Sequence, residues 1–167
     1  ERLLKVRTAF LSMATGKGKT LTSIYLASLF GYQTMVLMHR VNLFDQWKET
    51  INKVLPSAKV QLLDSKSPID PSANFVLLNP INVMKRERSE FANIGCLIVD
   101  EAHAICSEKM SRALFYFCPK ICIGLTATPD RSDEMDKILD LHFSEDRIIV
   151  PLQVECLYYK LETRLIP

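Results

Sequence analysis

Residues 13–20, which read Met-Ala-Thr-Gly-Lys-Gly-Lys-Thr, combine two glycines with a final lysine and threonine. Gly16 and Gly18 can let the backbone turn its N–H groups inward, as a site for nucleotide phosphates requires. Lys19 can reach the β and γ phosphates, and the Thr20 hydroxyl can ligate Mg²⁺. The segment predicts an ATP site, and a Gly-Lys-rich turn without a ligand is the alternative. The expected cofactor-binding residues are Thr15, Gly16, Lys17, Gly18, Lys19 and Thr20.

Two adjacent acids follow an apolar run in residues 96–103, which read Cys-Leu-Ile-Val-Asp-Glu-Ala-His. Adjacent carboxylates at the end of a buried strand are costly unless a cation compensates them, and Mg²⁺ is suited to this. We expect Asp100 to hold the metal together with Thr20, and Glu101 to polarise the attacking water. The candidate catalytic residues are Lys19, Asp100 and Glu101. His103 has no second ligand at zinc spacing, so the sequence does not indicate a zinc site.

A third apolar segment, residues 121–125, is followed by Thr-Ala-Thr-Pro. The two hydroxyls can belong to a site, but a turn at the end of a strand explains them about equally well. The residue types alone therefore assign no role to Thr126 and Thr128.

The segments around these motifs predict alternating strands and helices. The expected strands lie near residues 8–13, 34–38, 60–63, 75–78, 96–99 and 121–125, and the expected helices near 20–30, 42–55, 107–116 and 134–141. Such alternation is typical of an α/β fold with a mainly parallel sheet covered by helices on both faces. Ligands of such sheets gather where the strands end, and all three motifs follow a predicted strand. Residues 148–150 and 154–159 are candidates for further strands.

The first two predicted helices have recognisable ends. Gly31 lies where a helix C-terminus favours glycine, and Asn42 is a plausible N-cap for the second helix. Trp47 continues the apolar face of that second helix. We therefore expect Trp47 in the core, with stacking on a base as the alternative.

The composition is that of one compact domain. The 167 residues are 48% hydrophobic and 24% charged, and the formal net charge is +2. Bulk electrostatics does not indicate a nucleic-acid binder, so any such contact must be local. The five cysteines form no Cys-x-x-Cys pair and are expected to be reduced, mostly buried thiols. No signal peptide or membrane-spanning run is recognisable, so we expect a soluble, intracellular protein without membrane partners.

In order and type, the three motifs resemble motifs I, II and III of superfamily 2 helicases. Met13 stands where the full phosphate-loop pattern has its first glycine, and this variant looks like the form used by helicases and restriction motors of that superfamily. The resemblance implies a RecA-like P-loop NTPase domain with a DEAH-type motif II. It also implies that His103, Thr126 and Thr128 couple the ATP state to the grip on nucleic acid.

Two further segments are compared with the nucleic-acid motifs of the same superfamily. Residues 39–47, His-Arg-Val-Asn-Leu-Phe-Asp-Gln-Trp, resemble motif Ia, which implies a phosphate contact for Arg40. Asn79 and Asn82 lie where motif Ib usually has a threonine, and they are either phosphate contacts or helix caps. The basic run 85–88 is expected to be a solvated helix end rather than a binding patch.

The combination of motifs looks most like the XPB-like and restriction-motor branch, and is similar to the transcript-release DNA helicases of large cytoplasmic DNA viruses. This implies an ATP-dependent helicase acting on DNA, with RNA next, and for a viral protein a place in the host cytoplasm at the virus factory. Motifs IV to VI are not recognisable. We therefore expect a fragment in which residues 1–150 form the first RecA-like domain and residues 151–167 lead toward a second. Without the arginines of that second domain we expect little ATP turnover.

Two other functions are compatible with the same motifs. One is a motor or switch ATPase that translocates or remodels without separating strands, as in a restriction complex. The other is a nucleotide-binding or docking module that has lost its chemistry. The intact acid pair and the intact lysine and threonine of the phosphate loop argue against the second.

Overall fold

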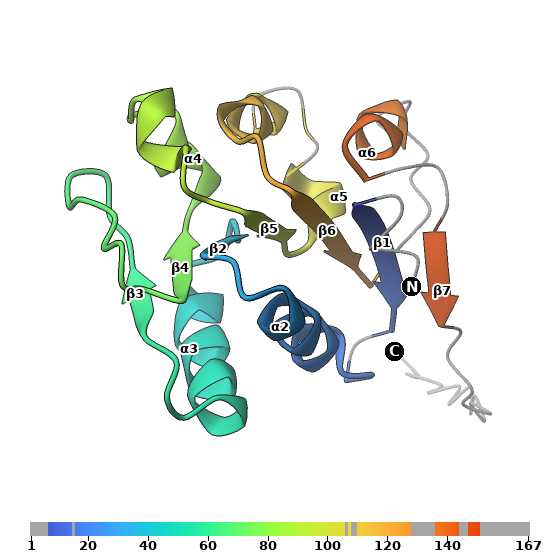
Figure 1. Ribbon diagram of the computed structural model, residues 1–167. Helices are drawn as coiled ribbons and strands as arrows, with labels where there is room; N and C mark the ends of the chain where they lie inside the picture. Colours follow the sequence, from blue (N-terminus) through green and yellow to red (C-terminus); the bar gives the residue numbers. More distant parts are fainter. Residues whose placement is uncertain are drawn as a thin grey trace, which may run out of the picture.

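A parallel sheet of seven strands forms the centre of the computed structural model, which describes residues 7–14, 16–105, 107, 110–127, 136–143 and 147–150. The strands are β1 (Thr8–Met13), β2 (Thr34–Leu37), β3 (Val60–Leu62), β4 (Phe75–Leu78), β5 (Cys96–Val99), β6 (Ile121–Thr126) and β7 (Arg147–Val150). They lie in the order β3-β4-β2-β5-β6-β1-β7, and each described pairing is parallel (Figure 1). The expected strands from residue 8 to residue 125 are therefore confirmed.

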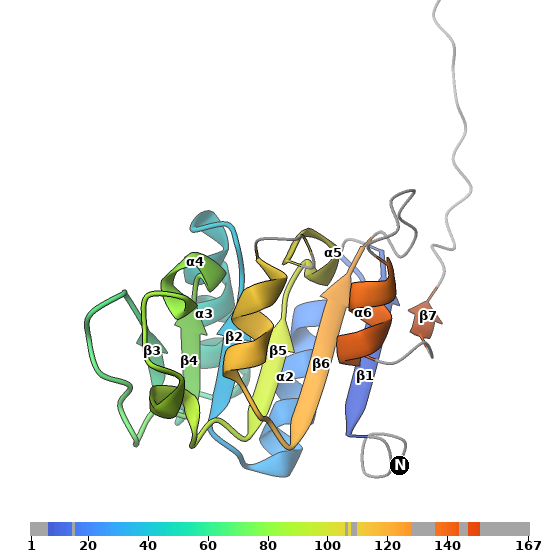
Figure 2. The same ribbon diagram turned by 90° about the horizontal axis from the view of Figure 1, so that it is seen from above.

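Helices cover both faces of this sheet. They are α2 (Lys19–Phe30), α3 (Asn42–Val54), α4 (Pro80–Val83), α5 (Ala102–Ile105) and α6 (Asp136–Phe143), with two 3₁₀ turns, η1 (Arg88–Phe91) and η2 (Ser111–Tyr116). Figures 1 and 2 show α2 and α3 on one face and α4, α5 and α6 on the other. Ile24 and Trp47 belong to the hydrophobic core under α2 and α3, and Phe143 belongs to the opposite core. This is the α/β architecture that the alternating pattern predicts.

The strand order brings distant residues to one edge of the sheet. β5 pairs with β2 on one side and with β6 on the other, and β6 pairs with β1. Because the strands are parallel, the segments that follow them leave from the same carboxyl edge. The acid pair after β5 therefore lies between the His-Arg segment after β2 and the threonine motif at the end of β6. The phosphate loop follows β1, the next strand along.

The helix expected over residues 107–116 is wrong. The described part of this segment ends in the short turn η2, after which Phe117 packs with its ring 4.6 Å from that of Phe91. Aromatic residues lose side-chain freedom in an α-helix, and packing against Phe91 favours the tighter turn here. α6 extends to Phe143, beyond the expected end at residue 141, and residues 134, 135 and 154–159 lie outside the described part of the chain. α4 and α5 were not predicted, because helices of four residues show no periodicity.

Of the two helix caps expected from the sequence, the one at the end of α2 is confirmed and the one at the start of α3 is wrong. Gly31 ends α2 with a φ of 65°, and its N–H donates to the Ala27 carbonyl at 3.3 Å, as a left-handed cap requires. Asn42 is not the N-cap of α3, because the preceding Val41 already has helical dihedral angles and no side chain caps the helix. Asp45 places a negative charge in the first turn instead, which favours this end of the helix dipole.

Arg86 departs from the expected solvated run. Its side chain is only 2% exposed. Its guanidinium donates to the carbonyl oxygens of Asp64, at 2.9 Å, and Ser67, and it pairs with Glu90 at 2.5 Å. Arg86 therefore closes the loop that carries these two carbonyls, while the rest of the run is exposed. This role depends on residues far away in the sequence and leaves no local signal.

The described cysteines differ in exposure. Cys96 is buried, and burial raises the pKa of its thiol to about 12. Cys118 is exposed, so the expectation of buried thiols is wrong at that position. Within the described ranges, no helix combines the length and the apolar character that crossing a membrane requires.

Candidate nucleotide-binding site

The phosphate loop links β1 to α2 at the carboxyl edge of the sheet. Gly16 and Gly18 have φ angles of 78° and 82°, in the left-handed region that favours glycine. The Lys17 N–H donates to the Ala14 carbonyl at 3.2 Å and closes the turn. Gly18 is also the N-cap of α2, so the unpaired N–H groups of the first helical turn are available at the loop. Thr15 lies outside the described residues.

The side chain of Lys19 folds back across this loop. Its ammonium group donates to the carbonyl oxygen of Met13 at 2.8 Å. An ammonium binds charged phosphate oxygens more strongly than a neutral carbonyl, so this hydrogen bond can be exchanged for one to a nucleotide. Thr20 follows as a half-buried hydroxyl in the first turn of α2. These donors fit a polyphosphate, and the hydroxyl fits a metal site beside it.

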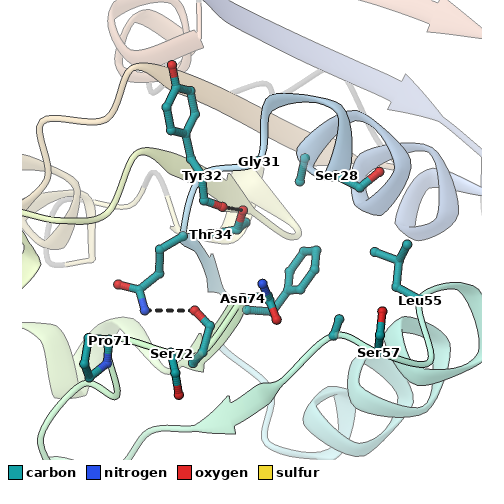
Figure 3. A pocket seen from close by; sticks show the side chains of 14 residues that line it. Ser28, Gly31, Tyr32, Thr34, Leu55, Ser57, Pro71, Ser72 and Asn74 are labelled. Atoms are coloured by element: carbon teal, nitrogen blue, oxygen red, sulfur yellow. Dashed lines mark hydrogen bonds between the residues drawn. The ribbon is translucent and has the colours of Figure 1, made fainter.

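Three parts of the chain line a single cleft of about 350 Å³ next to the loop. Its lining residues are Gly16, Gly18, Lys19, Thr20, Leu21, Leu43, Gln46, Trp47, Thr50, Asp100 and Glu101. Another pocket, of about 380 Å³, lies at the amino edge of the sheet, where β2 and β4 begin (Figure 3). Its lining is uncharged, so it offers neither a cation for phosphates nor an acid for a metal. The first cleft, which brings Lys19 together with the acid pair, is therefore the candidate nucleotide site.

Asp100 is the more buried of the two acids in the cleft, with 8% of its surface exposed. Its Oδ2 accepts a hydrogen bond from Nε1 of Trp47 at 2.8 Å, and its Oδ1 accepts one from the N–H of Glu101 at 3.0 Å. Burial raises the pKa of Asp100, and the hydrogen bond from Trp47 opposes this effect. A divalent metal would favour the ionised carboxylate by compensating its buried charge. The environment of Asp100 therefore fits a metal ligand.

Glu101 combines a strained backbone with a carboxylate oxygen that makes no hydrogen bond to a described group. Its φ is 48°, a region that residues other than glycine rarely adopt and that costs free energy. Its Oε2 is buried and makes no hydrogen bond with any described group, although Nδ1 of His103 lies 3.4 Å away. A buried acceptor left without a donor is unusual and calls for an explanation. A group that takes a proton from a water molecule in the cleft provides one.

His103 and Thr126 meet across neighbouring strands. Nδ1 of His103 lies 2.8 Å from Oγ1 of Thr126, which is fully buried. The contact joins the segment after β5 to the end of β6. Two of the three expected coupling residues are thus brought together, and Thr128 lies outside the described residues.

The three candidate nucleic-acid residues do not line the cleft. Asn79 uses its amide internally: Oδ1 accepts from a backbone N–H of α4 and Nδ2 donates to the His39 carbonyl, both at 3.0 Å. The helix-cap alternative is therefore confirmed for Asn79. Asn82 accepts from the Lys85 ammonium at 3.3 Å. Arg40 is exposed and donates from Nε to Nε2 of His39 at 3.2 Å. A phosphate contact stays a prediction for all three.

Trp47 lines the cleft, although its helical pattern predicted a core residue, with stacking on a base as the alternative. Its exposure of 1% confirms the expected burial, but its hydrogen bond to Asp100 was not predicted. A buried indole N–H usually has a partner, so the need for an acceptor was present in the sequence. Which residue provides that acceptor could not be read from the sequence.

The phosphate loop after β1, the acid pair after β5 and the parallel sheet between helices define a RecA-like P-loop nucleotide-binding domain. The family model described as Type III restriction enzyme, res subunit, matches residues 4–131. The chain belongs to this family. The resemblance to the first RecA-like domain of superfamily 2 helicases is therefore confirmed.

Two viral proteins are similar to most of this chain. The chain is 34% identical to "Putative helicase 161L" of Invertebrate iridescent virus 6 over 172 aligned residues. This alignment covers 99% of the chain and 39% of the viral protein. The chain is 29% identical over 142 residues to "Putative ATP-dependent RNA helicase QP509L" of African swine fever virus (isolate Tick/Malawi/Lil 20-1/1983), which covers 81% of this chain and 28% of that protein. The chain spans less than half the length of either relative.

The fold also occurs in a solved ATPase core. The Sulfolobus solfataricus SWI2/SNF2 ATPase core in complex with dsDNA matches with a TM-score of 0.69 at 19% identity, over 83% of this chain and 32% of that chain. Similarity at this level of identity shows the fold, and function has to be argued from the site.

Proposed function

We propose that this chain is the ATP-binding motor domain of an ATP-dependent nucleic-acid helicase, which hydrolyses ATP to ADP and phosphate in the presence of Mg²⁺. One observation carries the proposal: Lys19, Asp100 and Glu101 converge on one cleft of about 350 Å³. The membership of the chain in a family of restriction-enzyme motor subunits supports the same chemistry.

The N–H groups of the loop and four side chains of the cleft have separate tasks in this proposal. The N–H groups of the loop and Lys19 bind the β and γ phosphates. The Thr20 hydroxyl and the Asp100 carboxylate hold Mg²⁺, whose charge, when it is bound, offsets that of the phosphate oxygens. Oε2 of Glu101 accepts a proton from the attacking water, which makes the water oxygen more nucleophilic.

The contact between His103 and Thr126 is the proposed link between the ATP state and the grip on nucleic acid. Nδ1 of His103 lies 2.8 Å from Oγ1 of Thr126 and 3.4 Å from Oε2 of Glu101. A movement of Glu101 toward the attacking water would change its contact with Nδ1 of His103, and the same ring nitrogen contacts Thr126. Thr128 is proposed to act beside Thr126.

DNA is the proposed track, with RNA as the alternative. The SWI2/SNF2 core that shares the fold was solved with double-stranded DNA, whereas the African swine fever virus relative is named as an RNA helicase. The family's name, a restriction-enzyme subunit, favours DNA. Arg40 is the strongest candidate for a phosphate contact, because it is charged and exposed. Asn79 and Asn82 are the weaker ones, because their amides already have partners within the chain.

We also propose that residues 1–150 act against a second RecA-like domain, toward which residues 151–167 lead. An arginine from such a domain raises the rate of phosphoryl transfer by about a thousandfold or more. The chain alone would then bind the nucleotide but turn it over slowly. The viral relatives support an intracellular place of action, in the host cytoplasm.

The substitution Glu101→Gln in the full-length protein tests the proposal. We expect ATP binding to persist while nucleic-acid-stimulated turnover falls by about 100-fold or more, because an amide cannot accept the proton. Glu49→Gln, on the exposed surface of α3, is the matched control and should leave binding and turnover unchanged. Normal turnover in Glu101→Gln would remove this residue from catalysis. A wild-type protein that binds no ATP would overturn the proposed function.

Translocation without strand separation is the second candidate function, favoured by the description of the family as a restriction-enzyme subunit. Displacement of one strand from a duplex measures unwinding, whereas displacement of a third strand from a triplex measures movement alone. A protein that displaces only the third strand is a translocase. One that binds ATP but neither hydrolyses it nor moves is a docking module.

A further inference from the structure

Trp47 connects two elements that have different tasks in the proposed function. Its side chain leaves α3, the helix that follows the His-Arg segment, and it is 1% exposed. Its Nε1 donates to Oδ2 of Asp100 at 2.8 Å, although the two residues are 53 positions apart. The contact therefore joins the helix after the candidate nucleic-acid segment to the proposed metal ligand.

The hydrogen bonds to Asp100 act on different oxygens. Oδ1 accepts from the N–H of Glu101 at 3.0 Å and is thereby tied to its own turn. Oδ2 is held from another element by Trp47. The terminal torsion of an aspartate is broad, so a carboxylate held through Oδ1 alone could rotate. The indole N–H removes this freedom, and each oxygen keeps a second lone pair for a cation.

The indole itself has little freedom to move. Trp47 belongs to the buried cluster between the sheet and α2, with Ile24 and Ile98, both 0% exposed. Ile51, one turn further along α3, is also 0% exposed and belongs to the same cluster. Close packing holds such side chains in single rotamers, so the donor has a fixed position and the carboxylate must conform to it.

We propose that Trp47 is a positioning residue for the metal site, whose indole N–H holds the Asp100 carboxylate in the orientation that binds Mg²⁺ with the nucleotide. The inference rests on the proposed function, because it requires the cleft to bind a metal–nucleotide complex. Trp47 is not proposed as a metal ligand, and it acts on the metal site through its hydrogen bond to Asp100. A displacement of α3 would move the donor and with it the carboxylate.

Trp47→Phe tests the inference, because phenylalanine keeps a buried ring but has no donor. Binding of a non-hydrolysable ATP analogue is measured by calorimetry with and without Mg²⁺. We expect the Mg²⁺ affinity of the nucleotide complex to fall about tenfold, the effect of losing a hydrogen bond to a charged group, with metal-free binding within about twofold of wild type. Ile51→Val is the matched control: it removes a buried methyl group from the same helix face and should lower thermal stability without changing either affinity.

The fluorescence of the wild-type chain provides a second measurement that does not depend on the folding of a variant. Trp47 is the single tryptophan in the sequence, so its emission reports this contact. Mn²⁺ quenches indole emission at short range and should do so when added with the analogue, whereas Mg²⁺ should not.

Two results overturn the inference alone. One is Mg²⁺ affinity in a folded Trp47→Phe protein equal to that of wild type, and the other is metal-dependent analogue binding without Mn²⁺ quenching. If the wild type binds no nucleotide at all, the proposed function fails and the inference fails with it.

Discussion

The carboxyl and amino edges of the sheet carry cavities of similar size, about 350 and 380 Å³, but of different chemistry. Lys19, Asp100 and Glu101 line the first, whereas the second has only uncharged lining residues (Figure 3). α2 explains part of this difference. Its N-terminus presents N–H groups at the carboxyl edge, and its C-terminal cap, Gly31, lines the amino-edge pocket, where carbonyl groups disfavour phosphate. The direction of the strands and helices, not the volume of a cavity, therefore identifies the site.

Two aspartates, one near each edge of the sheet, also differ in how the fold affects their charge. Asp70, beside the amino-edge pocket, pairs with Lys59 at 2.7 Å and accepts hydrogen bonds from Ser72. The hydrogen bond with Lys59 is the main reason why the pKa of Asp70 is lowered to about 2. Asp100 at the other edge has its pKa raised by burial. The first carboxylate is stabilised by the folded chain, whereas the second is a cost to the fold that a bound cation would offset.

Substituting one lysine at each edge of the sheet should produce the largest difference in ATP turnover. Lys19→Ala should lower nucleic-acid-stimulated ATP turnover of the full-length protein by about 100-fold or more, because a charged group that binds the transferring phosphate is lost. Lys120→Ala is the matched control, since Lys120 lies at the amino edge, with its ammonium 4.8 Å from the centroid of the Tyr32 ring. It should leave turnover unchanged. Equal losses in the two variants would remove the distinction between the edges.

A smaller effect is expected from two buried threonines. Thr126→Val removes the hydroxyl that meets His103, and we expect nucleic acid to stimulate turnover several-fold less, a coupling loss of about 1 kcal/mol. Thr34→Val is the counterpart at the amino edge, where the hydroxyl donates to the Tyr32 carbonyl at 3.0 Å. It should cost about 1 kcal/mol of stability without changing stimulation. Stimulated and basal rates, with ATP affinity, measure both, and unchanged stimulation in Thr126→Val would argue against the coupling role.

The smallest effect concerns stability as a function of pH in the metal-free protein. The pKa of Asp100 is raised, so its destabilising charge is absent below the ordinary value of 3.8 and develops as the pH rises. The melting temperature of Asp100→Asn relative to wild type should therefore increase with pH above about 4, by a few degrees. The pKa of Asp70 is lowered to about 2, so its stabilising charge is present above 3.8 and is lost as the pH falls toward 2.

Asp70→Asn should accordingly lose stability relative to wild type at neutral pH, and the difference should shrink as the pH falls. Scanning calorimetry of both variants in chelator measures the two slopes. If the melting-temperature difference from wild type changed with pH in the same direction for both variants, the proposed contrast between a destabilising Asp100 and a stabilising Asp70 would be wrong.

Local patterns in the sequence predicted most of the fold. The strands were recognised because a parallel strand buried on both faces is a continuous apolar run, and β2, β4 and β5 are buried at every position. Local propensity failed where packing decides the conformation, as at η2, whose neighbour Phe117 packs on Phe91. Asn42 failed as a cap because a cap depends on the geometry of the preceding residue, which propensity does not specify.

The residues of the candidate site could be recognised for similar reasons. Gly16 and Gly18 act through their own backbone angles, and Lys19 and Thr20 follow Gly18 directly, so a short segment contains the whole candidate phosphate site. A metal site at the acid pair was predicted, because two charges at the end of a buried strand are costly unless a cation compensates them. Their partners were not predicted, because the hydrogen bonds between Trp47 and Asp100 and between His103 and Thr126 join residues far apart in the chain.

The amino-acid order was thus enough to establish the strands, the turn of the phosphate loop and the types of chemical group that end the strands. It was not enough to establish which strands are neighbours. β5 lies between β2 and β6, and this order places Asp100 against α3 and His103 against Thr126. Hydrophobic periodicity reports whether a strand is buried and on which face, but it is the same for every order of the strands. The partners of the candidate catalytic groups therefore depend on the packing of the whole sheet.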